Sequence, residues 1–270
     1  SINQNIRQQH ILIDCGEATQ IQLQKYKVKS SKIDKIFISH LHGDHIYGLP
    51  GLISSYNLNH RTLPLDVYAP EGLEEIIQTI LKHSGSSLHF PLRFHCIEPQ
   101  NGQLIFENEE IEVMSLEMIH RIPCSGFIFK EKKEKRKINK EKIGDLDIPL
   151  EWFDRLKNGE DFVTEEGKVI PNEHFTDAPP RPRSYAFCTD TAYNEAIIPY
   201  LNGVDLLYHE STFKEENIQR AKETFHSTTL QAAETAKQAN VGELILGHFS
   251  SRYEDLEPLK KEAQTIFKNS

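Results

Sequence analysis

The chain has 270 residues, of which 38% are hydrophobic and 26% charged, a mix typical of a globular protein with a buried core. No apolar run approaches the ~18 residues that a membrane span needs, which excludes an integral membrane protein. The net charge of -9 argues against nucleic-acid binding by the whole surface, but it leaves room for a local basic patch.

Short β-rich segments alternate with helical patterns along the chain. Strands are predicted at residues 10–14, 35–39, 65–69, 111–116, 184–188, 205–208 and 243–246. Apolar residues at three- and four-residue spacing predict helices at 17–26, 72–83 and 228–240, the last with Ser227 or Thr228 as its N-cap. This alternation indicates an α/β fold of sheets covered by helices.

One stretch departs from this alternation. Residues 130–142 carry eight basic and three acidic side chains, and 144–182 are rich in proline and glycine. A charged run of this kind is usually a solvated loop. We expect a single domain over residues 1–270, with an insertion at about 130–182 that projects from it.

The segment that follows the predicted strand 35–39 carries metal-binding chemistry. His40, His42, Asp44 and His45 form an HxHxDH pattern, and a lone structural histidine would not explain four ligand-type residues within six positions. Imidazole and carboxylate groups are the usual ligands of Zn²⁺ and similar cations. A turn that leaves a strand can direct them at one or two ions.

Three further ligand-type residues each follow an apolar strand. They are His120, Asp190 and His248. Since α/β proteins build their sites beyond the carboxyl ends of strands, we expect all three beside the HxHxDH segment. Alone, each has a plain structural role as a loop histidine, a helix cap or a strand-end hydrogen bonder. Together with the first motif they complete two metal sites that share a carboxylate.

These motifs resemble the metallo-β-lactamase superfamily and, within it, the ribonuclease Z family of tRNA 3′-processing endonucleases. The similarity spans about residues 10–266. It is carried by residues 14–20 (DCGEATQ), 39–52 (SHLHGDHIYGLPGL), 208–213 (YHESTF), 226–233 (HSTTLQAA) and 248–253 (HFSSRY). An HxHxDH pattern alone indicates only the superfamily, and its combination with His226-Ser227-Thr228 is much narrower.

The resemblance implies an αββα sandwich with a projecting arm and two zinc ions per subunit, with manganese as an alternative metal. It places His40, His42 and His120 on the first ion, Asp44, His45 and His248 on the second, and Asp190 between them. It makes Asp44 the proton acceptor. His226 becomes the acid that protonates the leaving group, and Glu210 holds its ring.

The same resemblance implies a hydrolase that removes 3′ trailers from precursor tRNA. Cleavage 3′ of the discriminator nucleotide leaves a 3′-hydroxyl on the tRNA. Arg252 would bind a substrate phosphate, although a surface salt bridge explains it equally well. A homodimer is implied, in which the arm of one subunit reaches substrate at the other, and residues 130–142 are our candidate for the positive end of that arm.

Three other functions use the same scaffold. A phosphodiesterase or other hydrolase of a small molecule would need neither His226 with Glu210 nor a long arm. A flavodiiron-like or persulfide-dioxygenase-like oxidoreductase would bind iron, and flavodiiron proteins favour a glutamate where His42 stands. An RNA-binding protein with structural metal is disfavoured because every ligand position is intact.

The sequence also departs from the family. The glycine-rich FLGTG turn that usually opens the family is absent, and family chains continue past Ser270. With neither an initiator Met nor an apolar leader, we expect a cytoplasmic protein whose natural chain extends beyond both ends. The segment 148–152 (IPLEW) lacks the Gly-Pro pair with which the family's arm often grips tRNA.

Overall fold

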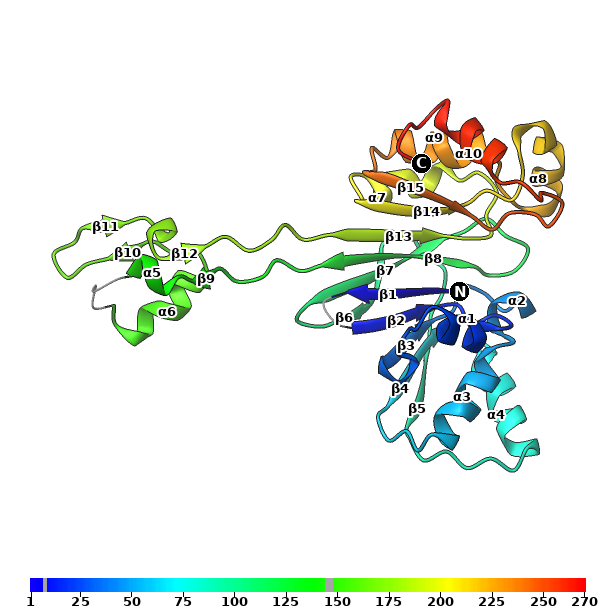
Figure 1. Ribbon diagram of the computed structural model, residues 1–270, viewed down its shortest axis with the longest axis horizontal. Coiled ribbons are helices and arrows are strands. Elements are labelled where there is room, and N and C mark those ends of the chain that lie inside the picture. The colour runs from blue at the N-terminus through cyan, green and yellow to red at the C-terminus, as the bar shows by residue number, and fades with distance from the viewer. Residues whose placement is uncertain (7–8, 144–147) are drawn as a thin grey trace.

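Two β-sheets pack face to face, and helices cover the outer face of each (Figure 1). The computed structural model describes residues 1–6, 9–143 and 148–270. The first sheet has the order β1-β2-β3-β4-β5. Its strands are β1 (Ile2–Ile6), β2 (Gln9–Ile13), β3 (Ile33–Phe37), β4 (Leu65–Ala69) and β5 (Leu92–Cys96). The strands from β2 to β5 are parallel, and β1 pairs with β2 in the antiparallel sense.

The second sheet has the order β15-β14-β13-β8-β7-β6. Its strands are β6 (Gln103–Glu107), β7 (Ile111–Glu117), β8 (Ser125–Glu131), β13 (Ser184–Cys188), β14 (Leu206–Glu210) and β15 (Glu243–Gly247). The strands β13, β14 and β15 run parallel, so their carboxyl ends reach the same edge of the sheet.

The helices divide between the two outer faces. Those beside the first sheet are α1 (Thr19–Lys25), α2 (Gly43–Ile46), α3 (Leu49–Leu58) and α4 (Leu73–His83). Those beside the second are α7 (Ile198–Leu201), α8 (Ile218–Thr224), α9 (Thr229–Gln238) and α10 (Glu257–Gln264). Thr228 caps α9 in a capping box with Gln231, which confirms the threonine of the two predicted caps.

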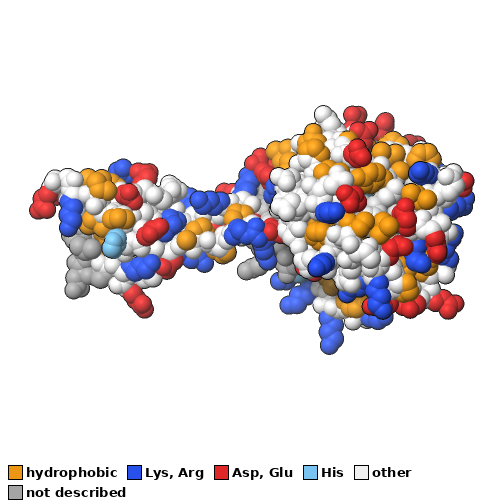
Figure 2. Space-filling view, turned by 90° about the horizontal axis from the view of Figure 1, so that it is seen from above, with side chains coloured by type: hydrophobic (Ala, Val, Ile, Leu, Met, Phe, Trp, Pro, Cys, Tyr) orange, Lys and Arg blue, Asp and Glu red, His pale blue; other side chains and the backbone are white. Residues whose placement is uncertain are grey.

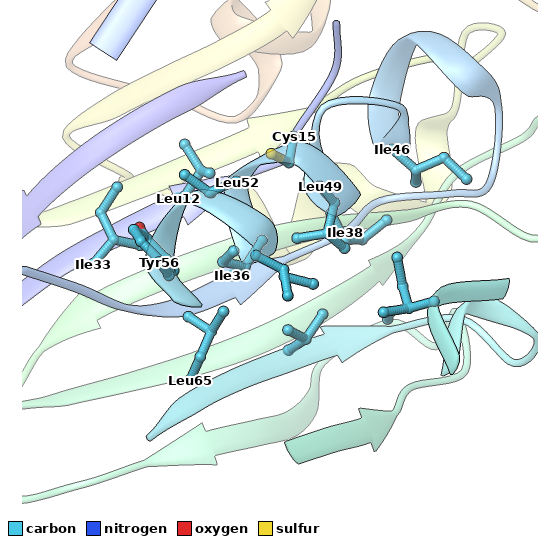
Figure 3. Packing of buried hydrophobic residues seen from close by; sticks show 14 of the residues in the cluster. Leu12, Cys15, Ile33, Ile36, Ile38, Ile46, Leu49, Leu52, Tyr56 and Leu65 are labelled. Atoms are coloured by element: carbon cyan, nitrogen blue, oxygen red, sulfur yellow. The ribbon is translucent and has the colours of Figure 1, made fainter. Parts of the chain in front are cut away.

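Three layers of apolar side chains hold the sandwich together. Leu12, Ile36 and Leu52 belong to the layer beneath the helices of the first sheet (Figure 3). A second layer fills the space between the sheets, where the Phe37 ring meets the edge of Phe127 at 5.6 Å. The third lies under α7, α9 and α10. The predicted α/β class and its αββα arrangement are therefore confirmed.

The segment between β8 and β13 leaves the sandwich and folds at a distance from it (Figure 1). Its elements are β9 (Lys137–Ile138), α5 (Lys140–Ile143), α6 (Leu150–Lys157), β10 (Phe162–Val163), β11 (Val169–Ile170) and β12 (Thr176–Asp177). We call residues 132–183 the arm. It has its own small core, in which Phe162 packs against Phe175 and Trp152.

Figure 2 shows Lys and Arg side chains along the narrow part of the arm that leads out from the sandwich. Within the described part of the chain, none of the helices has the length and apolar character required to cross a bilayer.

Candidate metal centre

All seven predicted metal ligands lie just beyond, or one turn after, the carboxyl end of a strand. They follow four different strands: β3 (His40, His42, Asp44 and His45), β7 (His120), β13 (Asp190) and β15 (His248). Asp44 and His45 belong to α2, which begins directly after His42. The structure therefore brings side chains that are up to 208 positions apart in sequence, such as those of His40 and His248, to one edge of the sandwich.

The first group of ligand atoms surrounds one side of Asp190. His40 Nε2 and His42 Nδ1 lie 2.9 Å apart, and His120 Nε2 lies 3.2 Å from His42 Nδ1. Asp190 Oδ2 lies 3.6 Å from His40 Nε2 and 3.9 Å from His120 Nε2. Three imidazoles and one carboxylate oxygen thus converge on a single point.

The second group surrounds the other oxygen of the same carboxylate. Asp190 Oδ1 lies 3.2 Å from His248 Nε2 and 3.6 Å from His45 Nε2. His45 Nε2 in turn lies 3.4 Å from Asp44 Oδ2. The two oxygens of Asp190 therefore face two different groups of ligands.

These groups fit divalent metal ions. Four ligands about 2.0–2.1 Å from a tetrahedral ion are separated from one another by about 3.3 Å. The distances within each group fall around that value, and all the atoms of a group lie within 4.8 Å of one another. Histidine nitrogens with carboxylate oxygens suit zinc, manganese and related cations.

Hydrogen bonds to the second ring nitrogen orient most of the histidines. His45 Nδ1 donates to Asp14 Oδ2 at 2.7 Å, and His40 Nδ1 lies 3.0 Å from Ser39 Oγ. His248 Nδ1 lies 2.9 Å from Thr212 Oγ1. In each case the Nε2 atom is left to face Asp190, as a metal ligand requires.

Asp14 is a buried residue that the sequence reasoning did not single out. Its carboxylate accepts hydrogen bonds from the backbone N–H of Ser39 at 2.8 Å, from Ser39 Oγ at 3.0 Å and from His45 Nδ1. Only 2% of the residue is exposed. Burial opposes a charge on His45, but the hydrogen bonds to Asp14 and Asp44 and the charges of Asp14 and Asp190 raise the pKa of His45 to about 10. The signal for Asp14 was its place at the end of a strand, within the DCGEATQ segment.

We expect Asp14→Asn to lower the affinity for metal by about 10–100-fold, because the neutral side chain turns an N–H toward the proton of His45 Nδ1. Metal bound per chain at buffered free zinc measures this. Asp66→Asn is the matched control, since Asp66 Oδ1 also pairs with a histidine, His95, outside the centre. Wild-type affinity in Asp14→Asn would contradict the role given to this carboxylate.

Close backbone approach fixes the HxHxDH segment against the DCGEATQ segment. A Cβ atom on Gly16 would lie 1.9 Å from the carbonyl oxygen of Asp44, and one on Gly48 would lie 2.0 Å from that of Gly16. The N–H of Cys15 donates to His45 O at 2.7 Å. The two glycines therefore allow the DCGEATQ segment to pack directly against the HxHxDH segment.

Three residues of the candidate metal centre have a left-handed backbone conformation. Asp14, Asp190 and His248 have φ angles of 55°, 42° and 58°. Residues other than glycine adopt this region rarely, at a cost of about 1–3 kcal/mol each, and such residues gather at functional sites. The strain is located at the strand ends that present the ligands.

His226 and Glu210 form a pair beside the second group. Glu210 is fully buried, and His226 Nδ1 donates to its Oε1 at 2.8 Å. The His226 ring stacks on that of the candidate ligand His248 with 5.3 Å between centroids. Burial disfavours the charged ring, but the hydrogen bond and charge of Glu210 outweigh it and raise the pKa of His226. Glu210 therefore favours the protonated form of the His226 ring.

His226 is also close enough to serve as a ligand. Its ring nitrogen, an oxygen of Asp190 and a nitrogen of His248 lie within 4.8 Å of one another. Geometry alone therefore permits two roles for His226, metal ligand or proton donor. Metal content after its removal separates them.

Arg252 and His209 lie outside the two groups of candidate ligands. Arg252 is exposed, stacks over the Phe213 ring at 4.9 Å and donates to Ser250 Oγ and Asn217 Oδ1, each at 3.2 Å. Within the described residues it pairs with no carboxylate, so its charge is free for an anion. His209 is fully buried, and burial lowers its pKa, as expected of a packed core histidine.

Comparison with known proteins places the fold first. A family model described as "Anti-Pycsar protein Apyc1" matches residues 2–137, the half that ends before Asp190 and His226. The metallo-β-lactamase fold protein YhfI from Bacillus subtilis is 22% identical, with a TM-score of 0.64 over 96% of this chain and 81% of that one. Human tRNase Z, short form, is 28% identical, with a TM-score of 0.68 over 93% and 85%. The chain is therefore an enzyme of the metallo-β-lactamase fold.

Relatives that match nearly the whole chain narrow this class. Ribonuclease Z of Parabacteroides distasonis is 46% identical over 97% of this chain and 86% of its own length. That alignment continues through the rest of the arm and the second half of the sandwich, beyond residue 137, where the Apyc1 match ends. The chain belongs to the ribonuclease Z family of hydrolytic tRNA endonucleases, which confirms the resemblance seen in its motifs.

Proposed function

We propose that this protein matures the 3′ end of tRNA, cutting precursor tRNA 3′ of the discriminator nucleotide. The observation that carries the proposal is the His226–Glu210 pair beside the metal ligands. Hydrolysis that leaves a 3′-hydroxyl on the tRNA expels a ribose oxygen. Such a leaving group is strongly basic and must be protonated as it departs, whereas the weakly basic leaving groups of many small esters depart without a proton. Precursor tRNA also implies a cytoplasmic location.

The proposed cofactors are two zinc ions, with manganese as the alternative. His40, His42 and His120 would hold the first, and Asp44, His45 and His248 the second. Asp190, with one oxygen toward each group, would bind both. Ions of this kind stabilise negative charge on a phosphate and acidify water.

The proposed proton transfers use two side chains on opposite sides of the reacting phosphate. Asp44 accepts the proton of the attacking water. Its side chain is 71% exposed, and the neighbouring His45 holds its pKa well below the usual range, so it is ionised. His226 donates a proton to the departing ribose oxygen, and Glu210 keeps its ring oriented for that transfer.

We assign RNA binding to the arm and to Arg252. A hollow of about 600 Å³ in the arm is lined by the basic residues Lys133, Lys135, Arg136 and Lys157 and by three acidic residues, Glu134, Asp161 and Glu173. Part of the basic run is neutralised within the protein, since Lys132 pairs with Glu107 and Lys142 with Asp177. The lysines and the arginine of the hollow are therefore our candidates for phosphate contacts.

Replacement of residues 134–180 by a short Gly-Ser turn is expected to abolish cleavage of precursor tRNA and to spare hydrolysis of a small phosphodiester. The two ends are close, because the N–H of Glu131 donates to Arg183 O at 2.9 Å. The rates on the two substrates measure the effect. Loss of both activities would make the arm a structural element.

A homodimer completes the proposal, with the arm of one subunit on RNA held at the other. Light scattering after gel filtration tests the mass. Mixing an arm-deleted subunit with a subunit that carries Asp190→Ala tests the exchange, because each mixed dimer would then have one active centre served by one intact arm. Recovered cleavage of tRNA supports the arrangement, and none from proven mixed dimers contradicts it.

The decisive experiment incubates zinc-loaded protein with a 3′-extended precursor tRNA and, in parallel, with bis(p-nitrophenyl) phosphate. A single cut after the discriminator nucleotide supports tRNA maturation. Diester hydrolysis with intact tRNA would instead favour the small-molecule phosphodiesterase. A precursor with a mispaired acceptor stem is the control for recognition of the folded RNA.

A further inference from the structure

The hydroxyl of Thr212 lies between a metal ligand and the proposed proton donor. Thr212 follows β14 and is 6% exposed. Its Oγ1 atom lies 2.7 Å from Glu210 Oε2, 2.9 Å from His248 Nδ1 and 2.9 Å from His248 O. A single hydroxyl thus contacts the ligand His248 and the carboxylate that holds His226.

The direction of these hydrogen bonds follows from the chemistry of His248. A histidine that binds metal through Nε2 carries its ring proton on Nδ1. That proton is donated to Thr212 Oγ1, which has a single proton of its own to donate. The carboxylate of Glu210 is both the closer and the charged acceptor, so it receives that proton.

Glu210 is buried and accepts the last of the hydrogen bonds that run from His248 through Thr212. It accepts from Thr191 N at 2.9 Å, Thr212 N at 3.1 Å, Thr212 Oγ1 at 2.7 Å and His226 Nδ1 at 2.8 Å. With four donors its two oxygens are fully satisfied. The position of the His226 ring therefore depends on a carboxylate that Thr212 helps to hold.

We propose that Thr212 is a positioning residue that couples metal binding at His248 to the orientation of the proton donor His226. The inference rests on the function proposed above and extends it to a residue with no direct contact to substrate. Metal on His248 fixes the proton on Nδ1, which fixes the Thr212 hydroxyl on Glu210.

The test uses Thr212→Val, which keeps the shape and removes the hydroxyl, and Thr212→Ser, which restores it. We expect the valine variant to bind the second zinc, the one assigned to His248, about 10–100-fold less tightly, as measured by metal content at buffered free zinc. At saturating zinc it should lose more activity on precursor tRNA than on bis(p-nitrophenyl) phosphate, whose leaving group needs no proton.

The controls separate this role from simple destabilisation. Thr212→Ser should recover both the zinc affinity and the ratio of the two rates. Thr235→Val, which removes a buried hydroxyl that bonds only within α9, should leave both unchanged. In a His226→Ala background Thr212→Val should no longer alter the ratio of rates, because the donor that it positions is gone.

Each other outcome overturns the proposal. Wild-type zinc affinity and rates in Thr212→Val remove Thr212 from the centre, and equal losses on both substrates at saturating zinc remove the coupling. If the valine variant does not fold, imidazole NMR of the zinc-loaded wild type decides, because the proposal requires a slowly exchanging proton on His248 Nδ1. Failure of the wild type to cleave tRNA refutes the proposed function, while the zinc affinities and this proton still test the link.

Discussion

Asp190→Ala is expected to release both metal ions and to reduce phosphodiester hydrolysis by about 10³-fold or more. The side chain faces the first group with Oδ2 and the second with Oδ1, so its removal takes a ligand from each. Bound metals supply several kcal/mol of transition-state stabilisation, and every ~1.4 kcal/mol is a factor of ten in rate. Metal content and rates on bis(p-nitrophenyl) phosphate measure the two effects.

Asp190→Asn is the matched variant for this experiment. Its amide keeps a single acceptor oxygen in place of two, so it can serve one group of ligands at most. We expect it to retain part of the metal that the alanine variant loses. Two tightly bound zinc ions with normal turnover in Asp190→Ala would refute the shared carboxylate.

The elements that the sequence predicts best are those with a strong one-sided pattern. The predicted strands 65–69 and 184–188 coincide with β4 and β13. The predicted helix 72–83 begins one residue before α4, whose acidic first turn and basic last turn suit the helix dipole. The edge strands β1, β5 and β6 were not predicted, although β15, which is also an edge strand, was. β5 and β6 bury little, so their side chains carry no clear alternation, and β1 lies at the other edge of the first sheet.

β8 was missed for the opposite reason. Residues 125–129 are all buried, since the strand lies between β7 and β13 with both faces covered. A short apolar run of this kind has no period of two, and Gly126 interrupts it further. The short elements of the arm depend on its own small core, which no local pattern reveals.

The candidate ligands could be found because their chemistry is rare at such spacing, but their supports could not. Asp14 and Thr212 are ordinary residue types, and each acquires its role only where the fold seats it behind a histidine. Asp14 meets His45 from just beyond β2, and Thr212 meets His248 from just beyond β14. Both of these ligands belong to the second group. A buried carboxylate thus supports each of them, directly or through one hydroxyl.

His226→Ala is expected to keep both metal ions and to slow cleavage of precursor tRNA by about 10²–10⁴-fold, the usual contribution of general acid catalysis. The alanine cannot protonate the ribose oxygen that leaves. Hydrolysis of bis(p-nitrophenyl) phosphate should fall far less, because p-nitrophenolate departs without a proton. Single-turnover rates on the two substrates, with metal content on the same preparations, measure this.

Two further variants test this prediction. Glu210→Gln should lose part of the same activity, because the neutral amide no longer favours a charged His226 ring. His83→Ala, at the end of α4, is a histidine control that should change nothing. If His226→Ala instead releases metal and loses both activities together, then His226 is a ligand, which its distance of under 4.8 Å from ligand atoms permits. In that case the proton donor must be sought elsewhere in the centre.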